Sequence, residues 1–449
     1  MRTNSIRRVN SILIFITLVF SSCSIQKQLA KSSQLLLHDP SLQNAEVGIS
    51  LFESATGRYL YNYQADKYFT PASNTKIFSC YAAMKWLGDS ILTLHYLEND
   101  TAIYIVPNGD PTVLHPDYKR QPAIEFLQKT KKKVHITDRN WNDDAWGSGW
   151  SWDDYNGDYM AERSAFPVYG NLVKWIQSKD TSEQAVLTNQ QTISVFSEPE
   201  VNWSVTFNTE GADSIFHVER KLSANDFTIH QGKECYAERS VPFVTNGLTS
   251  ALELLKDTIG KTIVLDNTFN VQGATHTIYS QPLDSMLMPM MHRSDNFFAE
   301  QSLLMVSNRF FGLMSDEKVT DTILKTDLKG LPQKPAWADG SGLSRYNLFT
   351  PLDFIFILNK MKDDFGMKRM QMIFPTGGKG TLSSYYKTDS GYIFAKTGTL
   401  SGVVALSGYL YTAKNKLIIF SLLVNNHQSS GAQIRRAIEQ YLKGIRRKY

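Results

Sequence analysis

The chain has 449 residues, enough for two or three domains or for one large domain with an insertion. Hydrophobic residues make up 42% and charged residues 20%, which excludes intrinsic disorder as the main state. The net charge is only +4, so the chain lacks the basic excess that a nucleic-acid-binding protein needs, and three cysteines are too few for a disulfide-dense scaffold.

Residues 1–22 have the pattern of a secretory signal. Three arginines precede the apolar run 12–20, which is shorter than the roughly 20 residues of a membrane-spanning helix, and small residues and Cys23 follow. A cysteine at this place resembles a bacterial lipobox, although Phe20 stands where leucine is usual. We therefore expect an exported protein at the periplasmic face of the envelope, held to the membrane only by lipid on Cys23. The alternative is a plain signal peptide with an incidental cysteine.

The first part of the mature chain predicts a short helical tether, a hairpin and a helix. Residues 26–45 form the expected tether. Val47–Phe52 and Arg58–Tyr63 alternate apolar and polar residues around a turn, which is typical of a β-hairpin. Residues 70–73 then begin an apolar helix, because proline near the start and serine in the first turn are usual start signals.

Residues 98–272 differ from the rest of the chain in their pattern of apolar and polar residues. This pattern predicts a β-rich inserted region of one or two subdomains. Short alternating runs recur there, and each predicts a strand. One helix, at about 244–256, interrupts them. The runs are Ala102–Val106, Val134–Thr137, Val201–Phe207, Ser214–Val218, Phe227–His230 and Thr262–Leu265.

The last part of the chain returns to helices and then to strands. The pattern is helical from residue 283 to about 309. Strands are expected at Tyr392–Lys396, Val403–Tyr411 and Leu417–Val424, followed by a helix near Ala432–Lys443. Strands at both ends of the chain with helices between them predict one α/β unit, formed by residues 23–97 and 273–449 and closed around the insertion.

A serine and a lysine at the start of the apolar helix form the first candidate catalytic pair. Ser-x-x-Lys occurs four times, but only Ser73 and Lys76 stand at such a helix start, where the spacing puts both side chains on one face. A serine hydroxyl becomes a nucleophile when a neighbouring base takes its proton. A buried lysine with a lowered pKa can be that base.

Two further motifs follow in the order that one enzyme superfamily requires. Ser294–Asn296 reads Ser-Asp-Asn beside a helix, and Lys396–Gly398 reads Lys-Thr-Gly at the end of a strand. Together with Ser-x-x-Lys they are the signature of β-lactamases and penicillin-binding proteins. The 221 positions from Ser73 to Ser294 exceed what a β-lactamase has between its first two motifs.

The layout resembles the low-molecular-mass D-Ala-D-Ala carboxypeptidase/endopeptidase family of the penicillin-binding-protein-four type. Four segments are similar to further motifs of that family: Gly-Asp-Pro-Thr at 109–112, Trp-x-Trp-Asp-Asp at 150–154, Asp-Gly-Ser-Gly-Leu-Ser-Arg at 339–345 and Gly-Thr-Leu at 380–382. Residues 383–386 depart from it, because the family tends to have a basic residue there.

The resemblance implies a fold, a reaction and site residues. The fold class is α/β (α+β), β-lactamase/transpeptidase-like, with an antiparallel sheet and a helical subdomain. Peptidoglycan stem peptides are the implied substrates and β-lactam antibiotics the inhibitors, and neither a metal nor another cofactor is required. The implied catalytic residues are Ser73, Lys76, Ser294, Asn296 and Lys396, and the implied substrate-binding residues are Thr397, Gly398 and Thr399.

Three alternatives stay open at this point. Asp154 is a candidate for binding the amine of a diamino acid in the stem peptide, or it is an ordinary turn aspartate. The enzyme is a D-Ala-D-Ala peptidase or a serine β-lactamase with faster deacylation. The third reading is a lipid-anchored protein that binds wall peptides without turnover, against which the intact motifs argue.

Overall fold

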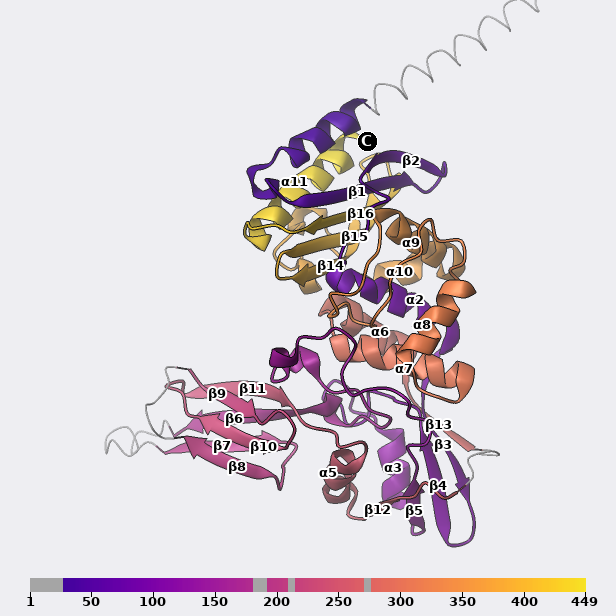
Figure 1. Cartoon of the computed structure of the whole chain (residues 1–449), viewed down its shortest axis with the longest axis vertical. Helices are drawn as coiled ribbons and strands as arrows, with labels where there is room; N and C mark the ends of the chain where they lie inside the picture. The colour runs from indigo at the N-terminus through magenta and orange to yellow at the C-terminus, as the bar shows by residue number, and fades with distance from the viewer. Residues whose placement is uncertain (1–26, 181–191, 209–214, 270–275) are drawn as a thin grey trace, which may run out of the picture.

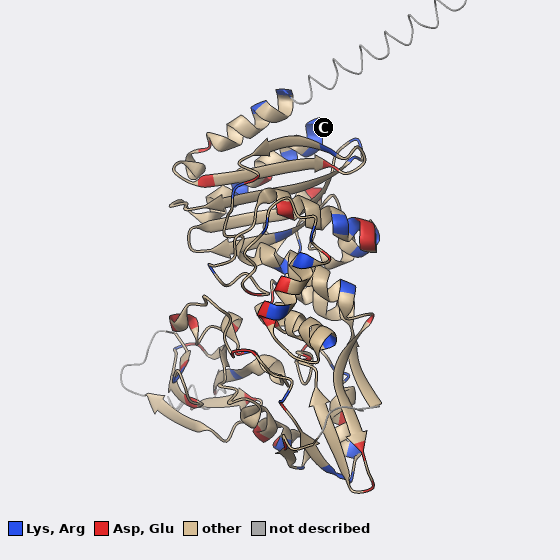
Figure 2. Cartoon of the chain, turned by 45° about the vertical axis from the view of Figure 1, so that its right-hand side comes forward, with Lys and Arg blue, Asp and Glu red and all other residues tan. Residues whose placement is uncertain are grey.

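The computed structural model describes residues 27–180, 192–208, 215–269 and 276–449. Two parts follow one another along the long axis of the molecule (Figure 1). We call the elements from β3 (Ser90–Glu98) through β13 (His276–Pro282) the insertion, and the elements before and after them the core unit. Basic and acidic residues are interspersed over both parts (Figure 2), in keeping with the small net charge.

The core unit is built on a five-stranded antiparallel sheet with the order β14-β15-β16-β1-β2. The predicted hairpin and the three predicted C-terminal strands are all present, and β1 pairs with β16. The strands are β1 (Glu46–Glu53), β2 (Arg58–Tyr63), β14 (Ile393–Leu400), β15 (Val403–Tyr411) and β16 (Leu417–Asn425).

Helices cover both faces of this sheet, because successive side chains of a strand point to opposite sides. On one face, Phe420 and Leu422 of β16 belong to the same apolar cluster as the helix at 27–37 and α11 (Gly431–Lys448). On the other face, Ile419 and Leu423 pack with α2 (Lys76–Trp86) and α9 (Pro351–Phe365). A strand buried on both faces has a nearly continuous apolar sequence, as β16 does.

The remaining helices of the core unit lie beside α2 and α9. The helical stretch expected from residue 283 to 309 is two helices, because the chain turns at residues 293–295, where Ser294 has a left-handed φ of 66°. No helix in the described part of the chain is long and apolar enough to cross a bilayer. The helices are α6 (Leu283–His292), α7 (Asn296–Phe311), α8 (Asp316–Lys325) and α10 (Met367–Ile373), with the 3₁₀ helices η1 (Pro40–Leu42), η2 (Ala72–Thr75), η6 (Gly380–Leu382) and η7 (Lys387–Asp389).

The insertion contains three sheets that share one apolar core. The largest has the order β12-β5-β4-β3-β13, and the two others have the orders β11-β6-β7 and β8-β10-β9. Further strands are β4 (Ala102–Pro107), β5 (Lys133–Ile136), β6 (Leu172–Lys179), β7 (Ile193–Glu198), β8 (Ser204–Asn208), β9 (His217–Arg220), β10 (Asp226–His230), β11 (Tyr236–Pro242) and β12 (Ile263–Leu265). The helices are α3 (Pro122–Lys129), α5 (Thr249–Ile259), η3 (Trp152–Asp154), η4 (Asp158–Met160) and η5 (Tyr169–Asn171).

The two ends of the insertion meet. The strands β3 and β13 pair with each other in antiparallel fashion and complete the five-stranded sheet of the insertion. The expected boundary 97/98 falls at the end of β3, and the expected boundary 272/273 falls shortly before β13. We propose that the insertion begins with β3 and ends with β13, so that the chain leaves the core unit and returns to it at one place.

Candidate active site

The first motif lies where η2 meets α2. Ser73 is half-buried in η2, and Lys76 is the fully buried first residue of α2. The Lys76 Nζ donates hydrogen bonds to Ser73 Oγ at 3.0 Å, to Asn296 Oδ1 at 2.6 Å and to the Ser341 carbonyl at 2.7 Å. The helix is buried along its whole first half, so the lysine cannot turn toward solvent.

The surroundings of Lys76 make it a better base than an exposed lysine. Burial lowers the pKa of Lys76 from 10.5 to about 8, and the nearby carboxylates of Asp339, Glu300 and Asp295 oppose this effect. A general base works best with a pKa near the working pH. The position of Lys76 and its lowered pKa are those of a candidate base for Ser73.

The second and third motifs meet on the other side of the serine. Lys396 of β14 is fully buried, and its Nζ donates to Ser294 Oγ and to the Thr397 carbonyl, both at 2.8 Å. Burial, together with the charge of Lys76, lowers the pKa of Lys396 well below its usual range. The structure thus brings Ser294 and Lys396 together, and Lys76 links Ser73 to Asn296 of the second motif.

The start of α7 positions Asn296. Asp295 is the N-cap of this helix and accepts a hydrogen bond from the Phe298 N–H at 3.0 Å. The Asn296 amide is held from two sides: its oxygen accepts from Lys76, and its Nδ2 donates to the Tyr159 carbonyl at 2.9 Å. The insertion therefore supplies a backbone group to the site.

The segment 339–345 forms a loop behind the nucleophile. The Asp339 carboxylate accepts hydrogen bonds from the Gly342 N–H at 2.8 Å, the Ser344 N–H at 2.6 Å and the Trp150 Nε1 at 2.9 Å. Gly342 has a φ of 82°, and a Cβ at this position would lie 1.9 Å from the Ala72 carbonyl oxygen. Only glycine lets the loop lie this close to the turn that carries Ser73.

A buried group of charges lies one turn along α7 from Asn296. The Glu300 carboxylate accepts a hydrogen bond from the Ser341 N–H at 2.7 Å. The carbonyl of Ser341 in turn accepts a hydrogen bond from Lys76 Nζ. The Arg163 guanidinium lies 3.5 Å from Glu300 and also pairs with Asp143 and Asp316. Burial raises the pKa of Glu300 to about 8. The contact between Glu300 and Arg163 was not predicted from the sequence, although a glutamate within the apolar run of α7 was an available signal.

The strand β14 forms the edge of the sheet beside the serine. Gly398 is buried, and a Cβ there would lie 2.6 Å from the Pro71 carbonyl oxygen, so the strand packs closely on the turn before Ser73. Thr397 is half-buried. Thr399 is exposed, and its Oγ1 accepts a hydrogen bond from Arg435 of α11 at 2.6 Å.

Asp154 is connected to the second motif only through Tyr159. It is half-buried at the end of η3, and its carboxylate interacts with the Tyr159 hydroxyl. Burial, followed by this interaction, raises the pKa of Tyr159 to about 12. The backbone carbonyl of Tyr159 accepts a hydrogen bond from Asn296. Cys23, the expected lipid anchor, lies outside the described residues.

Comparison with known proteins assigns the chain to a family. The D-Ala-D-Ala carboxypeptidase 3 (S13) family model matches residues 28–445, so the chain belongs to this family and is a peptidase. It is 24% identical to the D-alanyl-D-alanine carboxypeptidase of Actinomadura sp. (strain R39), over 89% of this chain and 81% of that protein. The predicted family and reaction class are confirmed.

Solved structures show the same fold. Penicillin binding protein 4 (dacB) from Haemophilus influenzae has a TM-score of 0.70 at 19% identity, with 93% of this chain and 98% of that chain covered. Bd3459, a predatory peptidoglycan endopeptidase from Bdellovibrio bacteriovorus, has a TM-score of 0.50 at 17% identity, with 90% and 93% covered. The predicted fold class is confirmed.

Proposed function

We propose that this member of the D-Ala-D-Ala carboxypeptidase family cleaves peptidoglycan stem peptides through an acyl-enzyme on Ser73. The Ser73 Oγ attacks the carbonyl between the two terminal D-alanines, and Lys76 accepts its proton. The observation that carries the proposal is the 3.0 Å hydrogen bond between the buried Lys76 Nζ and Ser73 Oγ. The backbone N–H groups of Ser73 and Thr399 stabilise the oxyanion.

Release of D-alanine needs a proton for the departing amine. Ser294 gives its hydroxyl proton to that nitrogen and is recharged by Lys396, to which it is hydrogen-bonded at 2.8 Å. The C–N bond breaks and leaves an ester on Ser73. Lys76 then releases to solvent the proton it took from Ser73, and Lys396 regains a proton. Water attacks the ester, neutral Lys76 takes the proton of the water, and this proton passes to Ser73 Oγ as the shortened peptide leaves.

Substrate recognition uses the edge strand and the amide at the start of α7. Asn296 hydrogen-bonds the peptide backbone of the substrate. Lys396, Thr397 and Thr399 face the terminal carboxylate, and Gly398 lets the strand approach the serine. A carboxylate beside a buried ammonium forms a charge-assisted hydrogen bond, which favours peptides with a free C-terminus.

Asp154 extends recognition to the side chain of the substrate. We propose that its carboxylate binds the free amine of a diamino acid in the stem. Its place beside Tyr159, whose carbonyl holds Asn296, supports this role.

Two further activities follow from the same chemistry. A β-lactam offers Ser73 an amide carbonyl whose leaving group stays attached, so the acyl-enzyme persists and the antibiotic inhibits. The Haemophilus relative is named as a penicillin binding protein, and the Bdellovibrio relative as an endopeptidase. Endopeptidase action on cross-linked stems requires only that the leaving amine belong to a second peptide.

We propose that the protein is exported and attached to the membrane by lipid on Cys23. The basic, apolar and small-residue segments of residues 1–22 support it. Cys23→Ser is expected to move the protein from the membrane fraction to the soluble fraction or to block processing of its leader. Unchanged membrane association of the variant would show that Cys23 is not the anchor.

Mass spectrometry after penicillin treatment tests the mechanism. The intact protein is expected to form a long-lived adduct on Ser73, and Ser73→Ala is expected to form none and to release no D-alanine from a stem pentapeptide. Rapid loss of the adduct would indicate a β-lactamase, and no adduct with no turnover would indicate a binding protein. Ser79→Ala, six positions after Ser73, is the matched control, because the Ser79 hydroxyl donates to the Gly340 carbonyl at 2.6 Å.

A further inference from the structure

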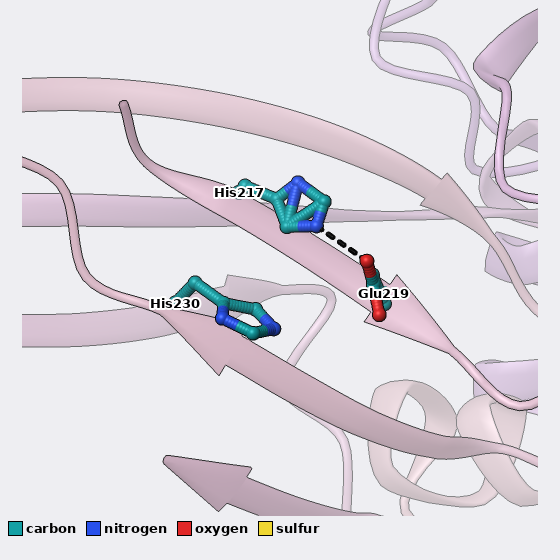
Figure 3. A group of neighbouring side chains, drawn as sticks. All are labelled: His217, Glu219 and His230. Atoms are coloured by element: carbon teal, nitrogen blue, oxygen red, sulfur yellow. Dashed lines mark hydrogen bonds and ion pairs between the residues drawn. The ribbon is translucent and has the colours of Figure 1, made fainter. Parts of the chain in front are cut away.

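Three side chains with metal-binding atoms gather on the outer face of the β8-β10-β9 sheet (Figure 3). They are His217 and Glu219 of β9 and His230 of β10, and their ligand atoms all lie within 4.8 Å of one another. No other such group occurs in the ranges that the structure describes. In Figure 1 this sheet lies at the far side of the insertion, away from α2 and β14.

Strand pairing fixes the arrangement of the three residues. His217 and His230 are directly opposite each other in the antiparallel pair β9–β10, and Glu219 is two positions along β9. Residues two apart on a strand point to the same face. Val218 and Ile229, the strand neighbours of these residues, are buried in the core of the insertion. His217, Glu219 and His230 therefore lie on the opposite, outer face of the sheet.

The distances within the group suit a shared ion. The His217 Nε2 lies 2.7 Å from Glu219 Oε1, and the two imidazole rings have centroids 4.9 Å apart. Side-chain exposure is 45% for His217 and 55% for Glu219, so an ion reaches the group directly from solvent. The amide of Asn208 on β8 lies 3.5 Å from His230 Nδ1, on the neighbouring strand.

We propose that His217, Glu219 and His230 bind a zinc ion. Two imidazole nitrogens and one carboxylate oxygen form a ligand set that zinc commonly takes, with water in the fourth position. Small rotamer changes bring the three ligand atoms around one centre, because the strands already hold their Cα atoms in place. The ion links β9 to β10 at the end opposite their connecting turn. It therefore stabilises the β8-β10-β9 sheet, which we call the outer sheet.

The competing arrangement is an ordinary surface hydrogen bond between His217 and Glu219 with no metal bound. Zinc binds imidazole nitrogens that carry no proton, so protons compete with the metal for its ligands.

Calorimetric titration of zinc into the tag-free protein tests the site. One zinc per chain is expected to bind, with an affinity that weakens from pH 7.5 to pH 5.5. The double variant His217→Ala/His230→Ala is expected to lose this binding. Two controls are expected to keep it: His276→Ala, a histidine of the β3–β13 pair in another sheet of the insertion, and Cys235→Ser, an exposed thiol five positions after His230.

Stability and activity provide the second measurement. Zinc is expected to raise the melting temperature of the parent protein and not that of the double variant, while D-alanine release by both stays unchanged with and without a chelator. The proposal is wrong if the parent protein binds no zinc, or if the double variant binds it as tightly. Failure of the zinc titration would leave the Ser73 mechanism untouched, because the two experiments read different sites.

Discussion

The core sheet and the outer sheet of the insertion use the same strand geometry in opposite ways. The β15 and β16 strands are buried on both faces nearly throughout. The β9 and β10 strands alternate between buried and accessible residues. One face of their sheet is therefore buried and the other is accessible to solvent. A strand covered on both sides leaves its side chains little freedom, whereas a one-sided strand offers half of its side chains to solvent.

The difference extends to charge. The core unit buries two lysines, Lys76 and Lys396, and the interface with the insertion buries Arg163 and Glu300. The outer sheet leaves His217 and Glu219 accessible but buries Arg220, whose guanidinium donates hydrogen bonds to the Lys221 and Leu222 carbonyls. Buried charges need complete sets of partners, so we expect substitutions at the core site to have large effects and matched substitutions in the insertion to have small ones.

The largest difference is expected from Lys76→Arg. Arginine keeps its proton at any accessible pH and cannot act as a base, so D-alanine release should fall by about 100-fold to 10,000-fold. The same exchange at Lys174 on β6, an accessible lysine paired with Glu198, should leave the rate unchanged. Steady-state assays with a stem pentapeptide make the comparison. A near-normal rate for Lys76→Arg would remove the lysine from the role of base.

The pH dependence of acylation should follow the buried lysine. The pKa of Lys76 is about 8, so its neutral form grows as the pH rises toward that value. The second-order rate of penicillin acylation should therefore rise roughly 50-fold from pH 6 to pH 8 and level off above it. Stopped-flow or quenched-flow measurement gives the profile. A rate that is flat over this range would mean that another group accepts the proton.

Two glycine substitutions compare the packing of the two parts. Gly342→Ala puts a methyl group against the Ala72 carbonyl at a left-handed φ of 82°, and should lower the free energy of unfolding by roughly 3 kcal/mol. Gly260→Ala, at the end of α5 in the insertion, has a φ of 69° with open space around it, and should cost only about 1 kcal/mol. Urea unfolding measures both. Equal losses would mean that the close approach at Gly342 carries no extra strain.

The smallest effect is expected at the border between the parts. Asp154→Asn removes the carboxylate charge but keeps the size of the side chain. The specificity constant for stem peptides with a free amine on the diamino acid should fall by a few fold, as for a partly exposed ion pair worth about 1 kcal/mol. Peptides with that amine acetylated should be cleaved as before. A loss of the same size for both substrates would assign Asp154 to structure only.

Local patterns predicted much of the fold. The hairpin, the C-terminal strands and six strands of the insertion (β4, β5, β8, β9, β10 and β12) depend on alternation within a few residues, and they lie close to where the sequence indicated. The strands β3, β6, β7, β11 and β13 were not predicted. In β3, the apolar residues Ile91, Leu92 and Leu94 do not alternate strictly with polar ones. Its partner β13 is almost 200 positions away, and a pairing at such separation leaves no mark in the local sequence.

The site shows the same division between local and distant information. The Ser73 and Lys76 pair is set by helical spacing, which the sequence displays directly. The contact of Lys76 with Asn296 depended on recognising motifs. The hydrogen bond that the Ser341 N–H donates to Glu300 joins positions 41 residues apart. Only the folded structure reveals this contact. The catalytic roles themselves remain predictions that the experiments above test.

The pairing of β1 with β16 has a consequence for how the protein is made. Glu46 pairs with Asn425, so the centre of the core sheet joins segments about 380 positions apart in the chain. During synthesis the first hairpin emerges long before its main partner, and the sheet cannot close until the last strands have left the ribosome. Until then the nascent chain keeps β1 without its main partner. Late closure thus leaves the core sheet open for most of the time that the chain takes to be made.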